Sequence, residues 1–152
     1  MTEPQQHTGS YYAATRNQTS EYPQLQGDQS ADVCVVGAGF TGVSTALHLV
    51  ERGYKVTLVE ANRVGWGASG RNGGQMIGGL SGESAIAKSL GVDAESVLWD
   101  LRWAGHKIIR DRVATYNIDC DLKSGYLDLA IKPRHIKDLH AELEMLDRHQ
   151  FA

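Results

Sequence analysis

Features that would place a protein outside the cytoplasm are missing from this sequence. Only two cysteines, Cys34 and Cys120, occur among its 152 residues, too few for a disulfide framework. The first ten residues lack the basic and apolar regions of a secretory signal, and no apolar run approaches the roughly 20 residues that span a bilayer. We therefore expect a reduced, cytoplasmic protein without a membrane span. Cys34 lies inside an apolar run and is expected to pack as a small hydrophobic residue.

Charge and metal-ligand patterns are also sparse. The net charge is −3 and no basic stripe is present, so nucleic acid is not an expected partner. The six histidines show no metal-ligand spacing, since even His135 and His140 are five residues apart rather than four. Asp119 and Asp121 flank Cys120, but carboxylates in such a place are more often solvated. We expect no metal site.

The stretch Asp32 to Glu60 carries the strongest signal in the chain. An apolar run, Val33 to Val36, leads into Gly37-Ala38-Gly39-Phe40-Thr41-Gly42, which has the GxGxxG pattern of dinucleotide-binding turns. An amphipathic helix follows, and then a second apolar run, Val56 to Val59, ends at an acidic residue. This order of strand, glycine turn, helix, strand and acid predicts a Rossmann-like βαβ unit of the α/β class.

Each part of the motif has a mechanical reason. Gly37 permits a tight turn, Gly39 lets the backbone approach a pyrophosphate, and Gly42 lets the helix lie close to the sheet. The pyrophosphate would sit on unpaired N–H groups at the helix N-terminus. Glu60 is placed to accept hydrogen bonds from ribose hydroxyls and would repel a 2′-phosphate, so FAD or NAD is favoured over NADP. The alternative is an ordinary βαβ unit with a glycine turn and a surface glutamate.

The next segment, residues 65–82, reads GWGASGRNGGQMIGGLSG. Its glycine content alone would suggest a flexible linker. A linker rarely carries Trp66, Arg71, Asn72 and Met76 among its glycines, however, and a backbone that passes close to a flat ligand explains the composition better. A flavin needs such a second loop, whereas an NAD domain has little use for one directly after its second strand.

Four pieces of the chain carry a family resemblance: SYYAATRN at residues 10–17, DVCVVGAGFTG at 32–42, ALHLVERGYKVTLVEANRVGWGASGRNGGQ at 46–75 and IIRDRVATYNIDCDLKSGYLDLA at 108–130. They resemble the N-terminal part of the D-amino-acid oxidase-like FAD-dependent amine oxidoreductases, the group that includes glycine and sarcosine oxidases. Within that group they are most similar to the bacterial gamma-glutamylputrescine oxidases. The GASGRNGGQ segment is much more specific to this flavin group than GxGxxG.

The resemblance implies that three segments hold FAD. The pyrophosphate would contact Gly37, Gly39, Phe40, Thr41 and Gly42. Glu60 would bind the adenosine ribose, with Ala61, Asn62 or Arg63 beside it. The inner phosphate, ribityl chain and flavin ring would be wrapped by Gly67, Ala68, Ser69, Arg71, Asn72, Gly73 and Gly74, with Gln75 and Met76 close to the flavin face. Because the loop contains no His or Cys, we expect the FAD to be non-covalent.

Composition and periodicity divide the chain into three segments. Residues 1–31 form a polar extension, expected to be extended or poorly ordered, and residues 32–92 form the FAD-binding segment. Residues 93–152 are expected to begin an α+β substrate domain. The chain is too short for the whole fold of the resembled family, so we expect an N-terminal fragment of a longer oxidase with an incomplete fold.

The sequence of the third segment predicts a helix, then a strand, then a second helix. Asp93 could cap a helix that runs to about Tyr116. Apolar residues recur along one face of it, at Leu98, Leu101, Gly105, Ile109, Val113 and Tyr116. Trp99 and Trp103 adjoin that face. We favour a role for these two side chains in core or interdomain packing over a role as an aromatic wall that contacts a ligand. Residues 126–131 alternate as a strand does, and Pro133 opens a helix with Ile136, Leu139, Leu143 and Leu146 on one side.

The resemblance also implies a chemistry. An amine such as gamma-glutamylputrescine would be oxidised to an imine and then an aldehyde, while O2 is reduced to H2O2. The expected partners are a small-molecule amine, O2 and the remainder of the enzyme; no catalytic residue is assigned and the oligomeric state is not indicated. Two alternatives remain, an NAD-linked dehydrogenase domain and a non-catalytic FAD-binding module.

Overall fold

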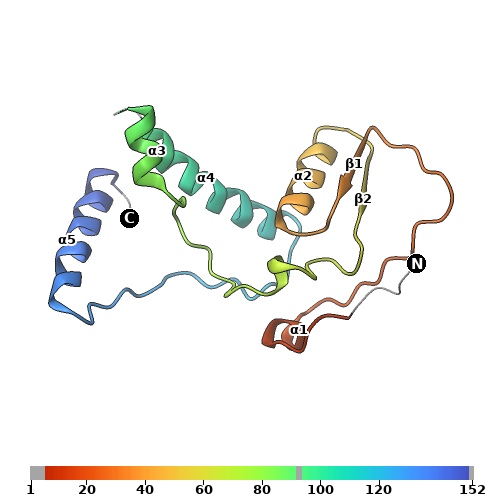
Figure 1. Cartoon of the computed structure of the whole chain (residues 1–152), viewed down its shortest axis with the longest axis horizontal. Helices are drawn as coiled ribbons and strands as arrows, with labels where there is room; N and C mark the ends of the chain where they lie inside the picture. The colour runs from red at the N-terminus through yellow and green to blue at the C-terminus, as the bar shows by residue number, and fades with distance from the viewer. Residues whose placement is uncertain (1–5, 92–93, 151–152) are drawn as a thin grey trace. The chain divides into compact units, whose positions relative to one another are not determined.

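The computed structural model describes residues 6–91 and 94–150 of the chain (Figure 1). Their elements, in chain order, are α1 (Tyr11–Thr15), β1 (Val33–Val36), α2 (Phe40–Val50), β2 (Val56–Val59), the 3-10 turn η1 (Ala68–Gly70), α3 (Glu83–Leu90), α4 (Ala94–Thr115) and α5 (Pro133–Arg148). The chain divides into two compact units between Ile118 and Asp119. The first unit contains every element from α1 to α4, and the second contains α5.

The predicted βαβ unit is present. β1 and β2 are parallel neighbours, with Val33 opposite Val56 and Val36 opposite Val59. The helix α2 connects them, as a parallel pair requires a crossover, and it lies beside both strands (Figure 1). A side-chain bond secures the start of the pair, because Oδ2 of Asp32 accepts a hydrogen bond from the Lys55 amide at 2.8 Å. The structure therefore has mixed helix and sheet character, with one small parallel sheet among the described residues.

Two glycines fix where α2 begins and how its far end turns back. A Cβ atom on Gly42 would lie 1.8 Å from the Gly37 carbonyl oxygen, so only glycine lets the helix approach the strand end this closely. After the helix, Gly53 has φ of 87°, a left-handed conformation that glycine adopts without strain. Gly53 thereby lets the chain turn back from the helix towards β2.

The expectation that Cys34 packs as a hydrophobic residue is wrong. Residues of β1 alternate between half-buried and exposed; Val33 and Val35 are half-buried, whereas Cys34 is exposed and Val36 is 82% exposed. Successive side chains of a strand point to opposite faces, and Cys34 and Val36 lie on the face that no described element covers. Both cysteines are free thiols.

The helix predicted from residue 93 is confirmed as α4, although the proposed cap, Asp93, lies outside the described residues. Its apolar face is covered only in part, since Leu98 is buried while Leu101 and Tyr116 are more than half exposed. The helix packs along α3, which the sequence did not predict. At its other end, Arg112 and Tyr116 contact Glu51, just after α2, at 3.2 Å each.

Trp99 and Trp103 have the packing role that we favoured. Their rings meet edge to face with centroids 5.7 Å apart, and Trp103 also lies edge to face with His106 at 4.9 Å. A Cβ on Gly78 would lie 3.0 Å from the Trp103 ring, so the later part of the glycine-rich segment 65–82 lies against this indole.

The N-terminal extension is more ordered than we expected. Residues 11–15 form α1, and the Ser10 side chain caps it by accepting a hydrogen bond from the Ala13 amide at 3.2 Å. Serine at this position satisfies an amide that has no acceptor within the helix. The polar composition of the extension concealed this local signal.

In the second unit one prediction is confirmed and one is wrong. Helix α5 begins with Pro133 in its first turn, as expected. Residues 126–131 form no strand, and Tyr126, Leu127, Leu129 and Ile131 are each at least 68% exposed. An alternating pattern becomes a strand only when a neighbour supplies a hydrogen-bond ladder, and none pairs with this stretch among the described residues.

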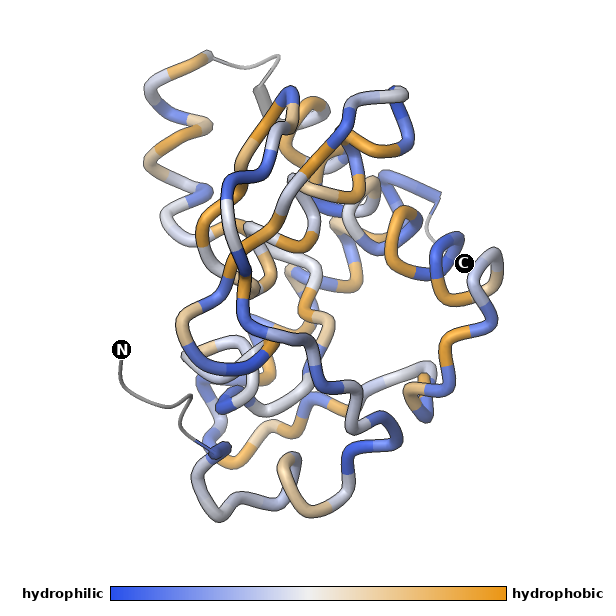
Figure 2. Tube along the Cα trace, turned by 90° about the vertical axis from the view of Figure 1, so that its right-hand side faces the viewer, coloured by the Kyte–Doolittle hydropathy of each residue, from blue (hydrophilic) through white to orange (hydrophobic). Residues whose placement is uncertain are grey.

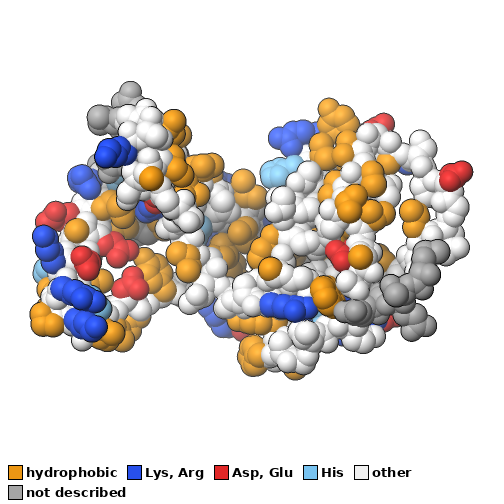
Figure 3. All heavy atoms as spheres, viewed as in Figure 1, with side chains coloured by type: hydrophobic (Ala, Val, Ile, Leu, Met, Phe, Trp, Pro, Cys, Tyr) orange, Lys and Arg blue, Asp and Glu red, His pale blue; other side chains and the backbone are white. Residues whose placement is uncertain are grey.

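Much of the apolar surface of the described residues is exposed. Ala38 and Leu98 are the two buried apolar residues among them, and hydrophobic side chains are widespread at the surface in Figure 3. Apolar and polar positions alternate along the helical turns in Figure 2, but the described apolar positions other than Leu98 are half-buried or exposed. No helix within residues 6–91 and 94–150 combines the length and apolar character that crossing a membrane requires.

Candidate functional site

The glycine turn after β1 is tied to the end of β2. Gly37 has φ of 99°, which turns the chain out of the strand, and its amide donates to the Val59 carbonyl at 2.7 Å. Ala38 follows and is 1% exposed. Its carbonyl accepts a hydrogen bond from the Gly65 amide at 2.9 Å. The turn therefore contacts both the second strand and the start of the glycine-rich loop.

Glu60 closes this arrangement from the end of β2. Its Oε2 accepts from the Ala38 amide at 2.8 Å, and its Oε1 accepts from the Asn62 amide at 2.9 Å. The bond from Ala38, followed by the bond from Asn62, lowers the pKa of the Glu60 carboxyl below its ordinary value, because both favour the ionised form. A carboxylate thus lies beside the glycine turn, where the motif predicted one.

The first residues of α2 face the glycine loop. The Ser69 hydroxyl, on η1, accepts a hydrogen bond from the Phe40 amide at 2.9 Å. A Cβ on Gly39 would lie only 2.9 Å from this hydroxyl oxygen, so glycine is what admits Ser69 to the helix N-terminus. The following amides, of Thr41 and Gly42, belong to the helix turn whose N–H groups have no intrahelical acceptor. These amide donors and the Ser69 hydroxyl therefore lie together at the N-terminus of α2.

The glycine loop is folded on itself rather than being a flexible linker. Gly65 has φ of 71°, and a Cβ on Gly70 would lie 2.3 Å from the Gly65 carbonyl oxygen. The chain between them, with Gly67 and Ala68, therefore makes a tight turn that sequence composition alone could not distinguish from a linker. Its compactness is what fixes Ser69 in place.

Arg71 and Asn72 stabilise the loop from within. The Arg71 guanidinium lies 4.6 Å from the Trp66 ring centroid, and its Nε donates to the Trp66 carbonyl at 3.1 Å. Asn72 donates to the Ser69 carbonyl at 2.6 Å and accepts from the Gly74 amide at 2.7 Å. Asn72 therefore makes a turn with its own backbone, and both side chains support the loop.

The remaining predicted residues lie farther along the chain. Gly73 and Gly74 follow this turn, and a Cβ on Gly74 would contact the Tyr12 ring at 3.5 Å. Gln75 is exposed and Met76 is half-buried in the segment that leads to α3, and no hydrogen bond joins either to the glycine turn among the described residues. The structure therefore brings together the turn, Glu60 and Ser69, but not Gln75 and Met76.

The residues just after Glu60 turn towards the N-terminal extension. Ala61 is exposed and Asn62 is half-buried. Arg63 pairs with Glu21, with Nη1 and Oε1 3.0 Å apart. Farther along, the Trp66 indole donates to the Gln6 carbonyl at 3.0 Å. Sequence reasoning missed this role of the extension, although the SYYAATRN piece at residues 10–17 offered a signal.

The arrangement fits a dinucleotide. Helix N-terminal amides attract a phosphate anion. A Cβ on Gly42 would collide with the Gly37 carbonyl oxygen, and a Cβ on Gly39 would displace the Ser69 hydroxyl. A carboxylate lies beside the turn, where ribose hydroxyls could donate to it. In the part of the chain that is described, no group of three or more His, Cys, Asp or Glu could hold a metal ion.

Comparison with known proteins agrees with this site. The gamma-glutamylputrescine oxidoreductase of Escherichia coli is 43% identical over 145 residues, which are 95% of this chain and 34% of that enzyme. The probable oxidoreductase OrdL of Haemophilus influenzae is 46% identical over 136 residues, 89% of this chain and 32% of that protein. The D-amino acid dehydrogenase 2 of Pseudomonas aeruginosa is 45% identical over 71 residues, 46% of this chain and 16% of that enzyme. No solved structure matches the chain significantly.

The shared region is a limited part of these relatives. The chain spans about a third of the length of the first two. A family model described as FAD dependent oxidoreductase, DAO, matches residues 32–152 and so includes the glycine turn, Glu60 and the glycine loop. By this match over most of its length, the chain belongs to the DAO family of FAD-dependent oxidoreductases.

Proposed function

We propose that this chain is the FAD-binding portion of an oxidase that converts an amine, gamma-glutamylputrescine or a related compound, to an aldehyde, with O2 reduced to H2O2. The observation that carries the cofactor assignment is the convergence of the helix N-terminus, the Ser69 hydroxyl and the Glu60 carboxylate at the glycine turn. The choice of amine substrate rests on the similarity to the Escherichia coli enzyme, whose name specifies gamma-glutamylputrescine.

In this proposal, residues 32–92 form the Rossmann-like cofactor segment and residues 93–152 begin a substrate domain. The amides of Thr41 and Gly42 would donate to the pyrophosphate at the positive end of α2. The Glu60 carboxylate would accept hydrogen bonds from the adenosine ribose while keeping its bond to the Ala38 amide, because a carboxylate has about four acceptor sites. Ionised Glu60 would also repel the 2′-phosphate of NADP.

Ser69 gives the proposal its most specific contact. Its oxygen accepts from the Phe40 amide at 2.9 Å, which leaves the hydroxyl proton able to donate elsewhere. A phosphate oxygen at the helix N-terminus would be the natural acceptor. Asn72 and Arg71 would act indirectly, by keeping the loop folded so that Ser69 stays at the helix N-terminus.

When bound, FAD supplies the hydride acceptor for amine oxidation, and the chain supplies binding, orientation and local charge. Non-covalent attachment is expected, since residues 65–82 contain no His or Cys. The overall reaction would consume the amine, O2 and water, and release an aldehyde, an amine or ammonia, and H2O2. The chain offers no residue to which we assign proton transfer, and the substrate pocket is not part of this proposal.

The first test is to purify the protein expressed from its complete reading frame and record its absorption spectrum. We expect a flavin spectrum, with the flavin released by denaturation as free FAD. A colourless protein that instead binds NAD would favour the alternative of an NAD-linked dehydrogenase domain. Flavin that stays attached after denaturation would contradict the expected non-covalent attachment but not the assignment of FAD as the cofactor.

The second test separates a flavin oxidase from a flavin-binding module without activity. Gamma-glutamylputrescine is added to the purified flavoprotein, and O2 consumption and H2O2 release are followed together. We expect both in equal amounts. Bleaching of the flavin without O2 consumption would indicate a dehydrogenase with another electron acceptor, and an unchanged spectrum with a panel of amines would overturn the amine assignment.

The third test addresses the phosphate contact directly. Ser69→Ala removes the hydroxyl and should weaken FAD binding by about 10- to 100-fold, because a hydrogen bond to a charged group contributes roughly 1.5–3 kcal/mol. Ser89→Ala is the matched control, since the Ser89 hydroxyl donates to the Ile86 carbonyl within α3. Equal FAD dissociation constants for the two variants would show that Ser69 does not contact the cofactor.

A further inference from the structure

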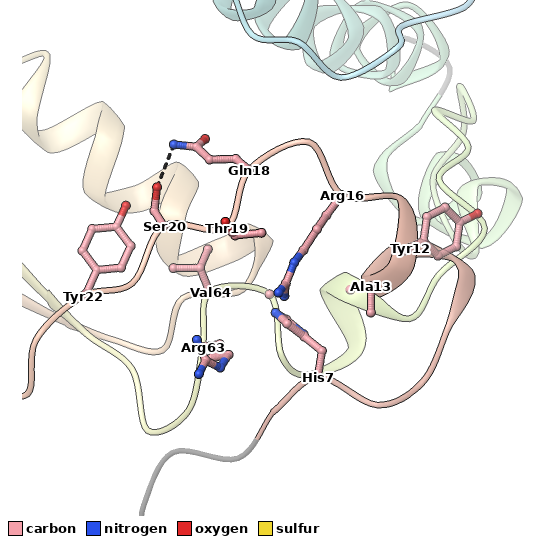
Figure 4. A pocket seen from close by; sticks show the side chains of 12 residues that line it. His7, Tyr12, Ala13, Arg16, Gln18, Thr19, Ser20, Tyr22, Arg63 and Val64 are labelled. Carbon is pink, nitrogen blue, oxygen red and sulfur yellow. Dashed lines mark hydrogen bonds between the residues drawn. The ribbon is translucent and has the colours of Figure 1, made fainter.

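A cavity lies between the N-terminal extension and the start of the glycine loop (Figure 4). Its volume is about 280 Å³, near the lower end of the range of small-molecule pockets. The extension contributes eight residues between His7 and Tyr22 to its wall, and the loop side contributes Arg63, Val64, Gly65 and Gly70. No residue of the glycine turn, 37–42, lines it, so the cavity is separate from the helix N-terminus described above.

The wall of this cavity is rich in cationic groups and hydrogen-bond donors. Arg16, Arg63 and His7 line it together with Tyr12, Thr19 and Ser20, and none of its described lining residues is acidic. The Arg16 side chain reaches towards the His7 ring in Figure 4. Arginine side chains match the geometry of phosphate and carboxylate groups and remain charged at every physiological pH.

The cationic groups of the wall are incompletely satisfied. Arg63 has one ion pair, with Glu21 at 3.0 Å, and that carboxylate is 75% exposed. The Nε of Arg63 is buried and has no hydrogen-bond partner, a condition that buried donors rarely show without an unseen water or ion. No hydrogen bond or ion pair engages Arg16 among the described residues. Arg16 and the Nε of Arg63 therefore keep donors that an acceptor in this cavity could engage.

We propose that this cavity binds an oxyanion, the phosphate or carboxylate group of a small molecule, between Arg16 and Arg63. The anion would bridge Arg16 and the unpartnered Nε of Arg63, which lie on segments far apart in the sequence, and so would fasten the N-terminal extension to the loop that carries Ser69. Occupancy of the cavity would thereby stabilise the loop side of the cofactor site. The oxyanion belongs either to FAD or to a separate molecule, and competition between them distinguishes these sources.

The test uses the protein expressed from its complete reading frame after its flavin has been removed. Inorganic phosphate is the probe, at constant ionic strength set with chloride. We expect saturable phosphate binding by calorimetry. Arg16→Gln should weaken it by about 10- to 100-fold, since a hydrogen bond to a charged group contributes roughly 1.5–3 kcal/mol. Arg134→Gln, on α5 in the other unit, is the matched control and should leave phosphate affinity unchanged.

Because Arg16 is exposed, its replacement is not expected to impair folding, and a circular dichroism spectrum checks this. Absence of saturable binding, or equal phosphate affinity in Arg16→Gln and wild type, would overturn the inference. Repeating the titration with saturating FAD identifies the source: loss of phosphate binding assigns the cavity to a cofactor phosphate, and unchanged binding assigns it to a separate molecule. The phosphate titration alone remains decisive if the protein binds no FAD.

Discussion

Oε2 of Glu60 accepts a hydrogen bond from the Ala38 amide at 2.8 Å, which joins the end of β2 to the turn that follows β1. This single contact explains how an acidic residue more than twenty positions away can belong to the glycine motif. The parallel register, with Val36 opposite Val59, brings the two strand ends to the same edge of the sheet. Glu60 then reaches an amide whose own residue is almost completely buried.

The first prediction concerns the charge of Glu60. Glu60→Gln keeps the shape but removes the charge from the bond to Ala38, and should lower the free energy of unfolding at pH 7 by about 1 kcal/mol. That is below the usual 1.5–3 kcal/mol of a charged hydrogen bond, because Glu60 is only half-buried and solvent screens it. Urea unfolding at several pH values measures the difference.

The pH dependence of this effect has a definite sign. The pKa of Glu60 is lower in the folded state than in the unfolded chain, so its stabilisation is complete above the ordinary glutamate pKa, about 4.3. It disappears as the pH falls through the lower folded-state pKa. The gap between wild type and Glu60→Gln should therefore close under acid. A difference in unfolding free energy that widens under acid would contradict this. The control is Asp28→Asn at an exposed position, which should leave the free energy of unfolding unchanged.

The second prediction compares the same substitution in two helices. Gly42→Ala would put a Cβ 1.8 Å from the Gly37 carbonyl oxygen, and should cost at least about 3 kcal/mol or prevent folding, as severe overpacking does. Gly105→Ala, in α4, meets nothing within 4 Å and should stabilise the protein by roughly 0.5–1 kcal/mol through helix propensity. Thermal unfolding of both variants measures the contrast. If both variants lost similar amounts of stability, close packing at Gly42 would not be the cause of the loss in Gly42→Ala.

The elements that sequence could predict are those whose patterns are satisfied locally. β1, β2 and α2 follow from two apolar runs, a glycine turn and a helix period, and Gly42 follows from the need for close contact. The position of Glu60 after β2 was likewise correct. These features depend on neighbours within a single βαβ unit, so a short stretch of sequence contains the required information.

What sequence could not predict depends on partners distant in the chain. Cys34 was expected to be covered, but its exposure depends on which elements pack against the second face of the sheet. Residues 126–131 alternate correctly yet form no strand, because a strand needs a neighbour. The contact of Trp66 with Gln6 joins residues 60 positions apart, and no periodicity encodes it.

The third prediction concerns that contact. Trp66→Phe keeps an aromatic ring for Arg71 but removes the N–H that donates to the Gln6 carbonyl at 3.0 Å. The N-terminal extension should be released more often, with proteolytic cleavage within residues 6–22 accelerated about 5-fold, since one net hydrogen bond contributes roughly 1 kcal/mol. Limited proteolysis with mass spectrometry measures the rate. Trp99→Phe, in α4, should leave it unchanged; equal acceleration would indicate general destabilisation instead.

The fourth prediction concerns the ion pair between α3 and α4. Arg102 Nη2 lies 2.5 Å from Glu83 Oε2, and the two side chains are only 12% and 28% exposed. Glu83→Gln would leave a largely buried guanidinium without its counter-charge and should cost about 1–3 kcal/mol. The matched variant is Asp111→Asn, which breaks the pair with Lys107 at 2.6 Å, where the side chains are 56% and 76% exposed. That exposed pair should contribute about 0.5 kcal/mol or less.

Salt separates the two pairs further. Added salt screens exposed charges strongly and partly buried ones weakly, so 1 M NaCl should erase the effect of Asp111→Asn and retain most of that of Glu83→Gln. Urea unfolding with and without salt measures both variants. If Glu83→Gln cost no more stability than Asp111→Asn, or if salt erased both effects equally, the α3–α4 pair would be a solvated surface contact.

Tryptophan fluorescence gives a second readout of the α3–α4 pair. Since Arg102 also lies over the Trp99 ring at 5.4 Å, loss of its partner Glu83 should alter the tryptophan fluorescence, a change that Asp111→Asn cannot produce.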